Sequence, residues 1–133
     1  MDDLRLGPLE YVYAPSTDVV ADARWLTEVL GGELVFAIDD GGARVAMVRL
    51  GTGGPPILVT DHLPDDRPVF LYRVYDLAAT ARALAARGWT SERTIELPMG
   101  PATTFHAPGG LRLAIFEATR RFVVDSMAGR RDF

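Results

Sequence analysis

The sequence of 133 residues contains no cysteine, only two histidines and no long hydrophobic run. Without cysteine the chain can form no disulfide, no thiol nucleophile and no thiolate metal site. A metal site that needs two or three imidazoles is almost excluded, because His62 and His106 are the only histidines. No apolar run approaches the roughly 18 residues of a membrane span, and the N-terminus lacks the basic and apolar segments of a signal peptide. We therefore expect a cytoplasmic protein.

The chain also lacks a strong excess of charge. The formal net charge is -4, and the acidic residues are spread along the sequence. This distribution argues against a binder of the phosphate backbone, so we expect neither nucleic acid nor a membrane as partner. Hydrophobic residues make up 48% and charged residues 24%, which is typical of a globular protein. The length predicts a single domain over residues 1–133, or two small halves that share a core.

Residues 7–61 predict a strand, a helix and three further strands. The helix lies in "YAPSTDVVADARWLTEVLGG", where Ser16, Thr17 or Asp18 can cap its N-terminus. An apolar stripe runs along it, and we expect Trp25 to lie in the core at the edge of this stripe. The stripe is formed by Val19, Ala23, Leu26 and Leu30, widened by Trp25 and Val29. The three strands are "ELVFAID", "ARVAMVRL" and "ILVTD", separated by glycine-rich turns.

Residues 68–118 repeat this order. The strand "VFLYRVYDL" precedes a helix capped by Asp76, and "RTIELP", "TTFHAP" and "LRLAIFE" follow as strands. Asp18 and Asp76 are 58 positions apart, and at that offset Val19 matches Leu77. Internal repetition of this kind predicts an α+β fold of two βαβββ modules, 7–61 and 68–118. Residues 119–133 are expected to form a C-terminal tail or short helix.

This arrangement resembles the vicinal oxygen chelate superfamily, which includes glyoxalase I-like enzymes, extradiol dioxygenases and bleomycin-resistance-like proteins. The resemblance rests on "LEYVYAPSTDVVADARWLTEVLGG" in the first module, and on "YRVYDLAATARALAARGW" and "TFHAPGGLRLAIFE" in the second. It implies a cupped mixed sheet around a groove and a homodimer. In metal-using members, the first and last strands of each module place four ligands in that groove.

In this chain the corresponding positions are Tyr11, Leu58, Val69 and Ala114. Three of these residues carry no donor atom, and one phenol cannot replace a set of nitrogen, oxygen or thiolate ligands. The sequence therefore predicts neither a metal nor another cofactor.

Strand alternation from these positions predicts which side chains share the groove face. The opposite face, with Val12, Phe70, Tyr72, Val74, Leu113 and Ile115, should pack beneath the helices, and Glu117 should point away from the groove. The expected groove residues are Tyr11, Tyr13, Leu58, Thr60, Val69, Leu71, Arg73, His106, Arg112, Ala114 and Phe116. Aromatic rings, hydrocarbon and a few guanidinium groups are typical of a small-molecule pocket.

Three functions remain open at this point. The first is a metal-independent protein that sequesters or carries a partly aromatic ligand. The second is a lyase, isomerase or dioxygenase of the same superfamily, with atypical ligands or without metal, in which His106 or a tyrosine acts as acid or base. The third is an interaction module whose groove is filled by side chains. His62 lies in a loop beside Asp61, where a surface position is the usual one. The sequence does not identify a ligand.

Overall fold

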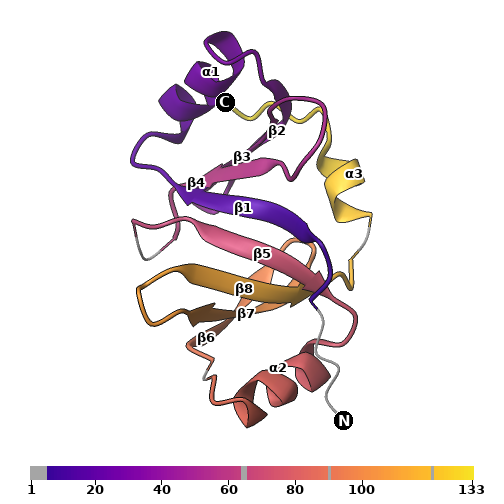
Figure 1. The fold of residues 1–133 in the computed structure, drawn as a ribbon. Helices are drawn as coiled ribbons and strands as arrows, with labels where there is room; N and C mark the ends of the chain where they lie inside the picture. Colours follow the sequence, from indigo (N-terminus) through magenta and orange to yellow (C-terminus); the bar gives the residue numbers. More distant parts are fainter. Residues whose placement is uncertain (1–5, 64–65, 90, 121) are drawn as a thin grey trace. The chain divides into compact units, whose positions relative to one another are not determined.

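The computed structural model describes residues 6–63, 66–89, 91–120 and 122–133, and it divides into two compact units (Figure 1). Unit 1 comprises Met1–Leu9 and Val69–Val124, and unit 2 comprises Glu10–Pro68 and Asp125–Phe133. Each unit holds a mixed four-stranded sheet with one helix of ten residues against it. The predicted α+β class with two βαβββ repeats is therefore confirmed.

Unit 2 is built from the first repeat. Its elements are β1 (Leu9–Pro15), α1 (Val19–Glu28), β2 (Glu33–Asp40), β3 (Ala43–Arg49) and β4 (Ile57–Thr60). The strand order is β2-β3-β4-β1, in which β1 runs parallel to β4 and the other pairs are antiparallel. The first and last strands of the repeat are thus neighbours.

Unit 1 repeats this topology. Its elements are β5 (Val69–Val74), α2 (Leu77–Ala86), β6 (Arg93–Leu97), β7 (Gly100–His106) and β8 (Arg112–Glu117). The strand order is β5-β8-β7-β6, again with a parallel pair, β5 and β8, between the first and last strands. The sequence repeat thus corresponds to a repeat of strand connections.

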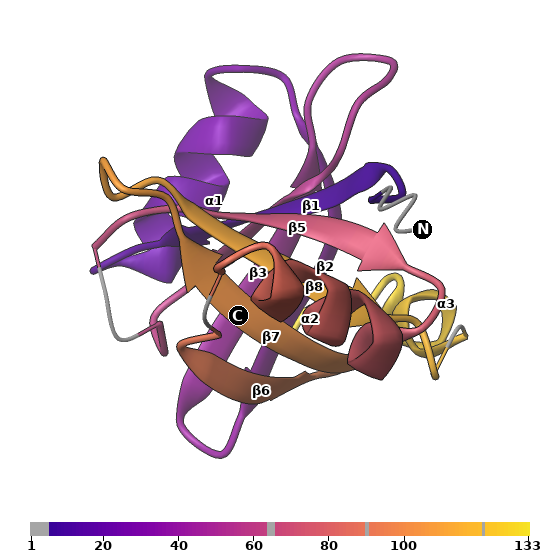
Figure 2. The ribbon, with the colours of Figure 1, turned by 60° about the horizontal axis from the view of Figure 1, so that its bottom comes forward.

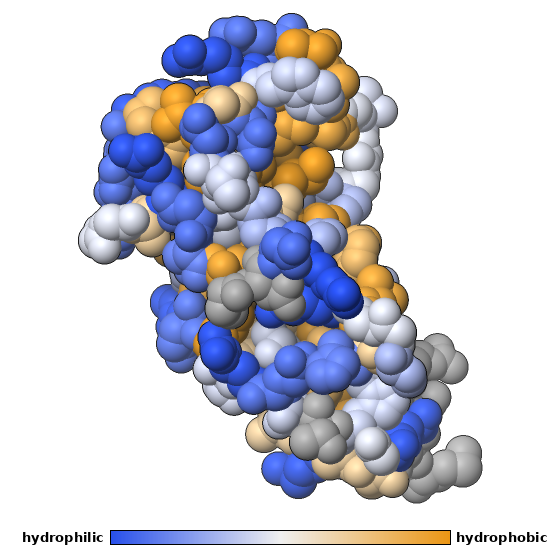
Figure 3. Space-filling view, turned by 90° about the vertical axis from the view of Figure 1, so that its left-hand side faces the viewer, coloured by the Kyte–Doolittle hydropathy of each residue, from blue (hydrophilic) through white to orange (hydrophobic). Residues whose placement is uncertain are grey.

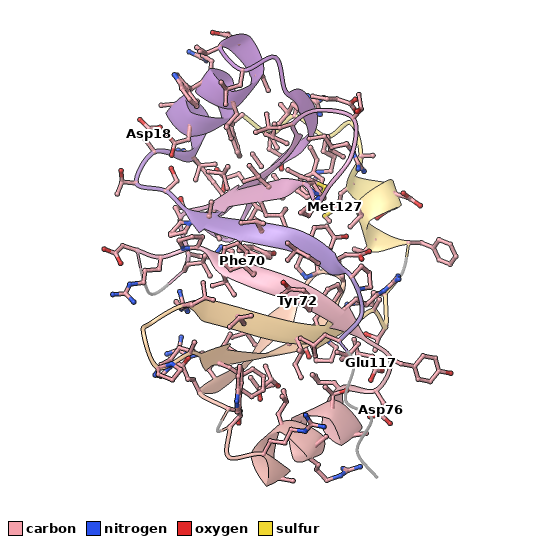
Figure 4. The ribbon with its side chains drawn as sticks, in the orientation of Figure 1. Asp18, Phe70, Tyr72, Asp76, Glu117 and Met127 are labelled. Carbon is pink, nitrogen blue, oxygen red and sulfur yellow. The ribbon has the colours of Figure 1, made fainter. Side chains whose placement is uncertain are left out.

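Equivalent aspartates start the two helices. The Ala21 N–H donates to Asp18 Oδ1 at 3.0 Å, and the Ala79 N–H donates to Asp76 Oδ1 at 3.0 Å. Each carboxylate satisfies one of the backbone donors that a helix leaves unpaired in its first turn. Figure 4 shows both aspartates at the helix starts. The predicted cap of the second helix, Asp76, is confirmed, and Asp18 is the cap among the three candidates for the first helix.

Each helix covers one face of its own sheet. In unit 2, Val19 and Ala23 of α1 pack against Ala46 and Val59 of the sheet. In unit 1, Leu84 of α2 packs with Val74, Phe105 and Ile115, with Tyr72 and Leu77 beside them. Figure 2 shows α2 lying across β7 and β8. The predicted packing of Tyr72, Val74 and Ile115 beneath a helix is therefore confirmed.

The predicted core position of Trp25 is wrong, because 52% of this residue is exposed. Trp25 is two residues from the buried Ala23, so it lies about 200° around the helix from that residue. Leu30 is also exposed, because α1 ends at Glu28 and Leu30 lies beyond it. Hydrophobic side chains are visible among the hydrophilic ones at the top of Figure 3.

The tail contains a short helix, α3 (Val123–Met127), and then returns to unit 2. The Ala37 N–H of β2 donates to the Arg130 carbonyl, and the Asp132 N–H donates to the Ala37 carbonyl. The tail therefore adds a short parallel segment to the edge of β2. Within the described ranges, no helix is long and apolar enough to cross a membrane.

Candidate functional site

The face of each sheet that lies opposite its helix is called here the helix-free face. Because side chains alternate along a strand, residues two apart share a face, and residues paired across strands point the same way. The residues predicted to line a groove can therefore be placed from the strand register within each unit.

In unit 1 the helix-free face is a continuous hydrophobic surface across β5 and β8. Leu71 pairs with Ala114, and Val69 and Phe116 occupy the neighbouring rows. All four side chains are buried, Ala114 completely. The arginines lie in the outer rows, where Arg112 pairs with Val69 and Arg73 pairs with Phe116. The register therefore places the six predicted residues of these two strands together on one face.

His106 extends this face onto β7. It pairs with Arg112 across β7 and β8, and its Nδ1 lies 2.7 Å from Glu92 Oε1. The His106 side chain is 57% exposed, and the Glu92 carboxylate contacts its imidazole at this exposed position. A carboxylate at this distance fixes the orientation of the ring.

Strand β7 also contributes residues that the sequence analysis missed. Ala102 pairs with Phe116 and Thr104 with Ala114, and both are buried on the helix-free face. Ile95 of β6 joins the same row as Ala102. Counting back from His106 in steps of two along β7 would have identified Thr104 and Ala102. The pairing of β6 with β7, which places Ile95 on this face, has no signal in the sequence.

In unit 2 the helix-free face centres on Tyr13. Tyr13 pairs with Leu58 across β1 and β4, and Thr60 pairs with Pro15. Tyr13, Leu58 and Thr60 are buried, and Tyr11, two residues before Tyr13, is partly buried. The register thus places the four predicted residues of this unit on one face.

Four further residues lie on this face and were missed. Met47 pairs with Leu58, and Phe36 pairs with Met47. Val45 pairs with Thr60, and Ile38 pairs with Val45. Met47 and Phe36 are buried. The register of β2 against β3 is irregular between Leu34 and Phe36, so the alternation of side chains shifts there. No residue type in the sequence indicates this shift.

Burial changes the chemistry of the phenol at the centre of this face. Burial raises the pKa of Tyr13 above its ordinary range, and the nearby Tyr11 phenol raises it further. An ionised phenolate in this place would lose its hydration, so Tyr13 remains a neutral group that can both donate and accept a hydrogen bond.

His62 lies beside this face. It is exposed, as expected for a loop residue, but its Nδ1 hydrogen-bonds the buried Thr60 hydroxyl. The bond anchors the imidazole to the end of β4. Asp61 is engaged elsewhere, because its Oδ1 accepts the Arg44 N–H at 2.9 Å. The sequence neighbours Asp61 and His62 therefore have separate partners in these contacts.

Glu117 points away from the helix-free face, as predicted. Its Oε1 accepts the Leu77 N–H at 2.9 Å, at the first residue of α2. Figure 4 shows Glu117 at the end of β8 near Asp76, which caps the same helix. This carboxylate therefore supports the start of the helix and is directed away from the helix-free face.

The donor set does not fit a metal. Leu58, Val69 and Ala114, three of the four positions at which the family resemblance implies ligands, are buried hydrocarbon. Among the residues that the structure describes, no group of three or more histidine, aspartate or glutamate side chains could hold an ion. Zinc, iron and nickel require several such donors at close to 2 Å. The described residues do not supply such a donor set.

Comparison with solved structures establishes the fold class. No family model matches the sequence, and no curated protein matches it. The chain nevertheless has the vicinal oxygen chelate fold, because solved structures of that fold superimpose on most of it.

Methylmalonyl-CoA epimerase from Mycobacterium tuberculosis superimposes with a TM-score of 0.73 and 18% identity, covering 92% of this chain and 95% of that chain. A variant of Streptomyces coelicolor methylmalonyl-CoA epimerase in complex with 2-nitronate-propionyl-CoA gives a TM-score of 0.70 at 13% identity, with 87% and 97% covered. The hypothetical protein BH1468 from Bacillus halodurans gives 0.69 at 12% identity, with 82% and 92% covered.

Proposed function

We propose that the chain is a metal-independent protein that binds a small, partly aromatic molecule and sequesters or carries it. The observation that supports this proposal is the buried hydrocarbon of Leu58, Val69 and Ala114, at positions where the resemblance implies metal ligands. Sequestration requires recognition alone, and it therefore needs no metal.

The helix-free faces have the composition that such recognition requires. Ligand sites are mostly apolar, with a few polar groups that fix orientation. Tyr11 in unit 2 is only partly buried, and it offers a ring that can stack and a hydroxyl that can hydrogen-bond. Arg73 and Arg112 in unit 1 lie beside hydrophobic rows, where a guanidinium can hold a carboxylate by two parallel bonds.

Thermal unfolding in the presence of a library of aromatic acids and their neutral amides tests the proposal. A ligand at 100 times its Kd stabilises the native state by about 2.7 kcal/mol, which is a measurable rise in Tm. We expect the shift to persist in EDTA and the purified chain to contain no stoichiometric metal. The proposal fails if no compound shifts Tm, or if EDTA abolishes the shift.

Substitutions then locate the binding residues. Tyr11→Phe, Arg73→Gln and Arg112→Gln should each weaken binding, the arginine variants more for acids than for amides. Arg24→Gln provides the matched control, because Arg24 is an exposed residue on α1. Equal weakening by Arg24→Gln would show that the arginines act only through overall charge.

A metal-free acid–base enzyme is the second candidate, and the His106–Glu92 pair favours it. The 2.7 Å contact holds an exposed imidazole in one orientation, which general acid–base catalysis requires. Methylmalonyl-CoA is the first compound to assay, because several structural neighbours are epimerases of that substrate. Turnover that disappears in His106→Ala while ligand binding persists would favour this candidate over simple sequestration.

A further inference from the structure

The C-terminal segment of residues 129–133 pairs with the outer edge of β2 in unit 2. The Gly129 N–H donates to the Val35 carbonyl at 2.8 Å, and the Ala37 N–H donates to the Arg130 carbonyl at 2.8 Å. The Asp132 N–H then donates to the Ala37 carbonyl at 2.7 Å. Backbone bonds alternate between the two strands, as in a parallel ladder.

Side chains of the segment add contacts that depend on its sequence. Arg131 Nη2 donates to the Leu34 carbonyl at 2.7 Å, and Arg131 Nη1 donates to the Val35 carbonyl at 3.3 Å. Asp132 Oδ2 accepts the Asp39 N–H at 3.0 Å. The hydrogen bond from the Asp39 N–H is the largest cause that lowers the pKa of Asp132. The second is a hydrogen bond from Arg130 Nη2 to Asp132 Oδ2.

The last residue anchors the segment. Phe133 packs against the core cluster beneath α1, which includes Val19, Ala46 and Val59. The Arg44 guanidinium lies over the Phe133 ring, 5.8 Å from its centroid. Five consecutive residues thus supply the backbone pairing, two polar side chains and one partly buried ring.

The connection that leads to this segment contains only a short helix. Helix α3 has five residues, of which Val123, Val124 and Met127 are partly buried and Asp125 and Ser126 are exposed. Phe122, just before α3, is 79% exposed. A segment whose recognition is local and whose tether contains no fully buried helix residue can exchange between chains, since the acceptor edge is identical in each copy.

We propose that the β2 edge is an acceptor site for the C-terminal segment of a second copy of this chain, which displaces the chain's own segment. Within one chain the tether gives the segment a high effective concentration, so the internal arrangement dominates in dilute solution. Exchange becomes competitive as the protein concentration rises.

A labelled peptide with the sequence of residues 127–133, MAGRRDF, tests the acceptor site on the full chain by fluorescence anisotropy. The variant Arg131→Ala/Phe133→Ala weakens its own segment and should bind this peptide at least about tenfold more tightly than the unaltered chain. A peptide with the order of residues reversed should not bind. Phe122→Ala is the matched control, and it should bind no more tightly than the unaltered chain.

Hydrogen exchange at the Ala37 amide reports whether the segment has left β2. The proposal is overturned if this amide exchanges freely in the double variant and the peptide still shows no saturable binding. If the double variant does not fold, excess peptide added to the unaltered ¹⁵N-labelled chain should move the Gly129 signal to that of an unstructured glycine. No movement at saturating peptide would also overturn the proposal.

Native mass spectrometry tests the second copy directly. Mixing the double variant with the unaltered chain should give mixed dimers, and excess MAGRRDF peptide should dissociate them. A dimer through another surface persists in excess peptide, so only the exchanged fraction of the mixed dimers responds. An amount of mixed dimer that excess peptide does not reduce at all would contradict strand exchange.

Discussion

Tyr13, on the helix-free face of unit 2, is 2% exposed. Burial of its phenol makes the free energy of unfolding depend on pH at high pH. Its folded-state pKa lies above the value of about 10 in an unfolded chain. Above pH 10 the unfolded chain loses this proton while the folded chain keeps it. Stability from this group is therefore complete below about pH 10 and falls as the pH rises.

We expect the free energy of unfolding to fall by up to about 1.4 kcal/mol per pH unit above pH 10 because of Tyr13. Urea unfolding between pH 9 and pH 12, roughly the range around the reference phenol value, measures this slope. Tyr13→Phe should reduce the slope, and Tyr75→Phe, at a residue 96% exposed, should leave it unchanged. All 14 basic residues are arginine, so no lysine titrates in this range. Identical slopes for Tyr13→Phe and the unaltered chain would contradict this account.

The capping aspartates give a second prediction for single residues. Asp18→Ala and Asp76→Ala should each lower the free energy of unfolding by about 1 kcal/mol, because each leaves an N–H in the first turn without its acceptor. Chemical denaturation measures both effects. Glu28→Ala, at an exposed position in the last turn of α1, is the control and should be close to neutral. A neutral Asp76→Ala would show that the Glu117 carboxylate alone supports the start of α2.

At the scale of elements, the start of β7 lies close against the backbone at the end of β8. Gly100 has φ +156°, and a Cβ at this position would overlap the Glu117 carbonyl oxygen. Gly100→Ala should therefore lower the free energy of unfolding by more than about 1 kcal/mol, since backbone must move to relieve the overlap.

Gly109→Ala is the matched control for this prediction. A Cβ at Gly109 would meet no atom of the described residues within 4 Å. Urea unfolding of the two variants compares a crowded glycine with an uncrowded one in the same unit. Equal stabilities would show that the β7–β8 contact relaxes without cost.

The strands show how far alternation can be trusted. From Val69 and Ala114 it predicted a shared face of β5 and β8, and the register confirms that these strands pair in parallel with the predicted rows. It did not identify Phe36 or Ile95, because the rows of β2 and β6 depend on hairpin register. The alternation of side chains determines which residues of one strand share a face. The register between strands determines which residues of the neighbouring strands lie beside them.

At the scale of the whole molecule, we expect a homodimer, as the resemblance to the vicinal oxygen chelate superfamily implies. Size-exclusion chromatography with light scattering should give twice the chain mass of 14.5 kDa. A dimer through another surface should survive Arg131→Ala/Phe133→Ala, whereas a dimer through strand exchange should lose its stability in that variant. A monomer at every accessible concentration would contradict the expectation.

The repeated βαβββ order, the Asp76 cap and the lack of donor atoms at Leu58, Val69 and Ala114 could all be read from the sequence alone. These features depend on local periodicity and on residue chemistry, which are present before the chain folds. Only the tertiary structure decided the exposure of Trp25, the His106–Glu92 contact and the pairing of residues 129–133 with β2. Each of these depends on which distant surface a segment meets, because helix rotation and strand register are settled by packing between elements.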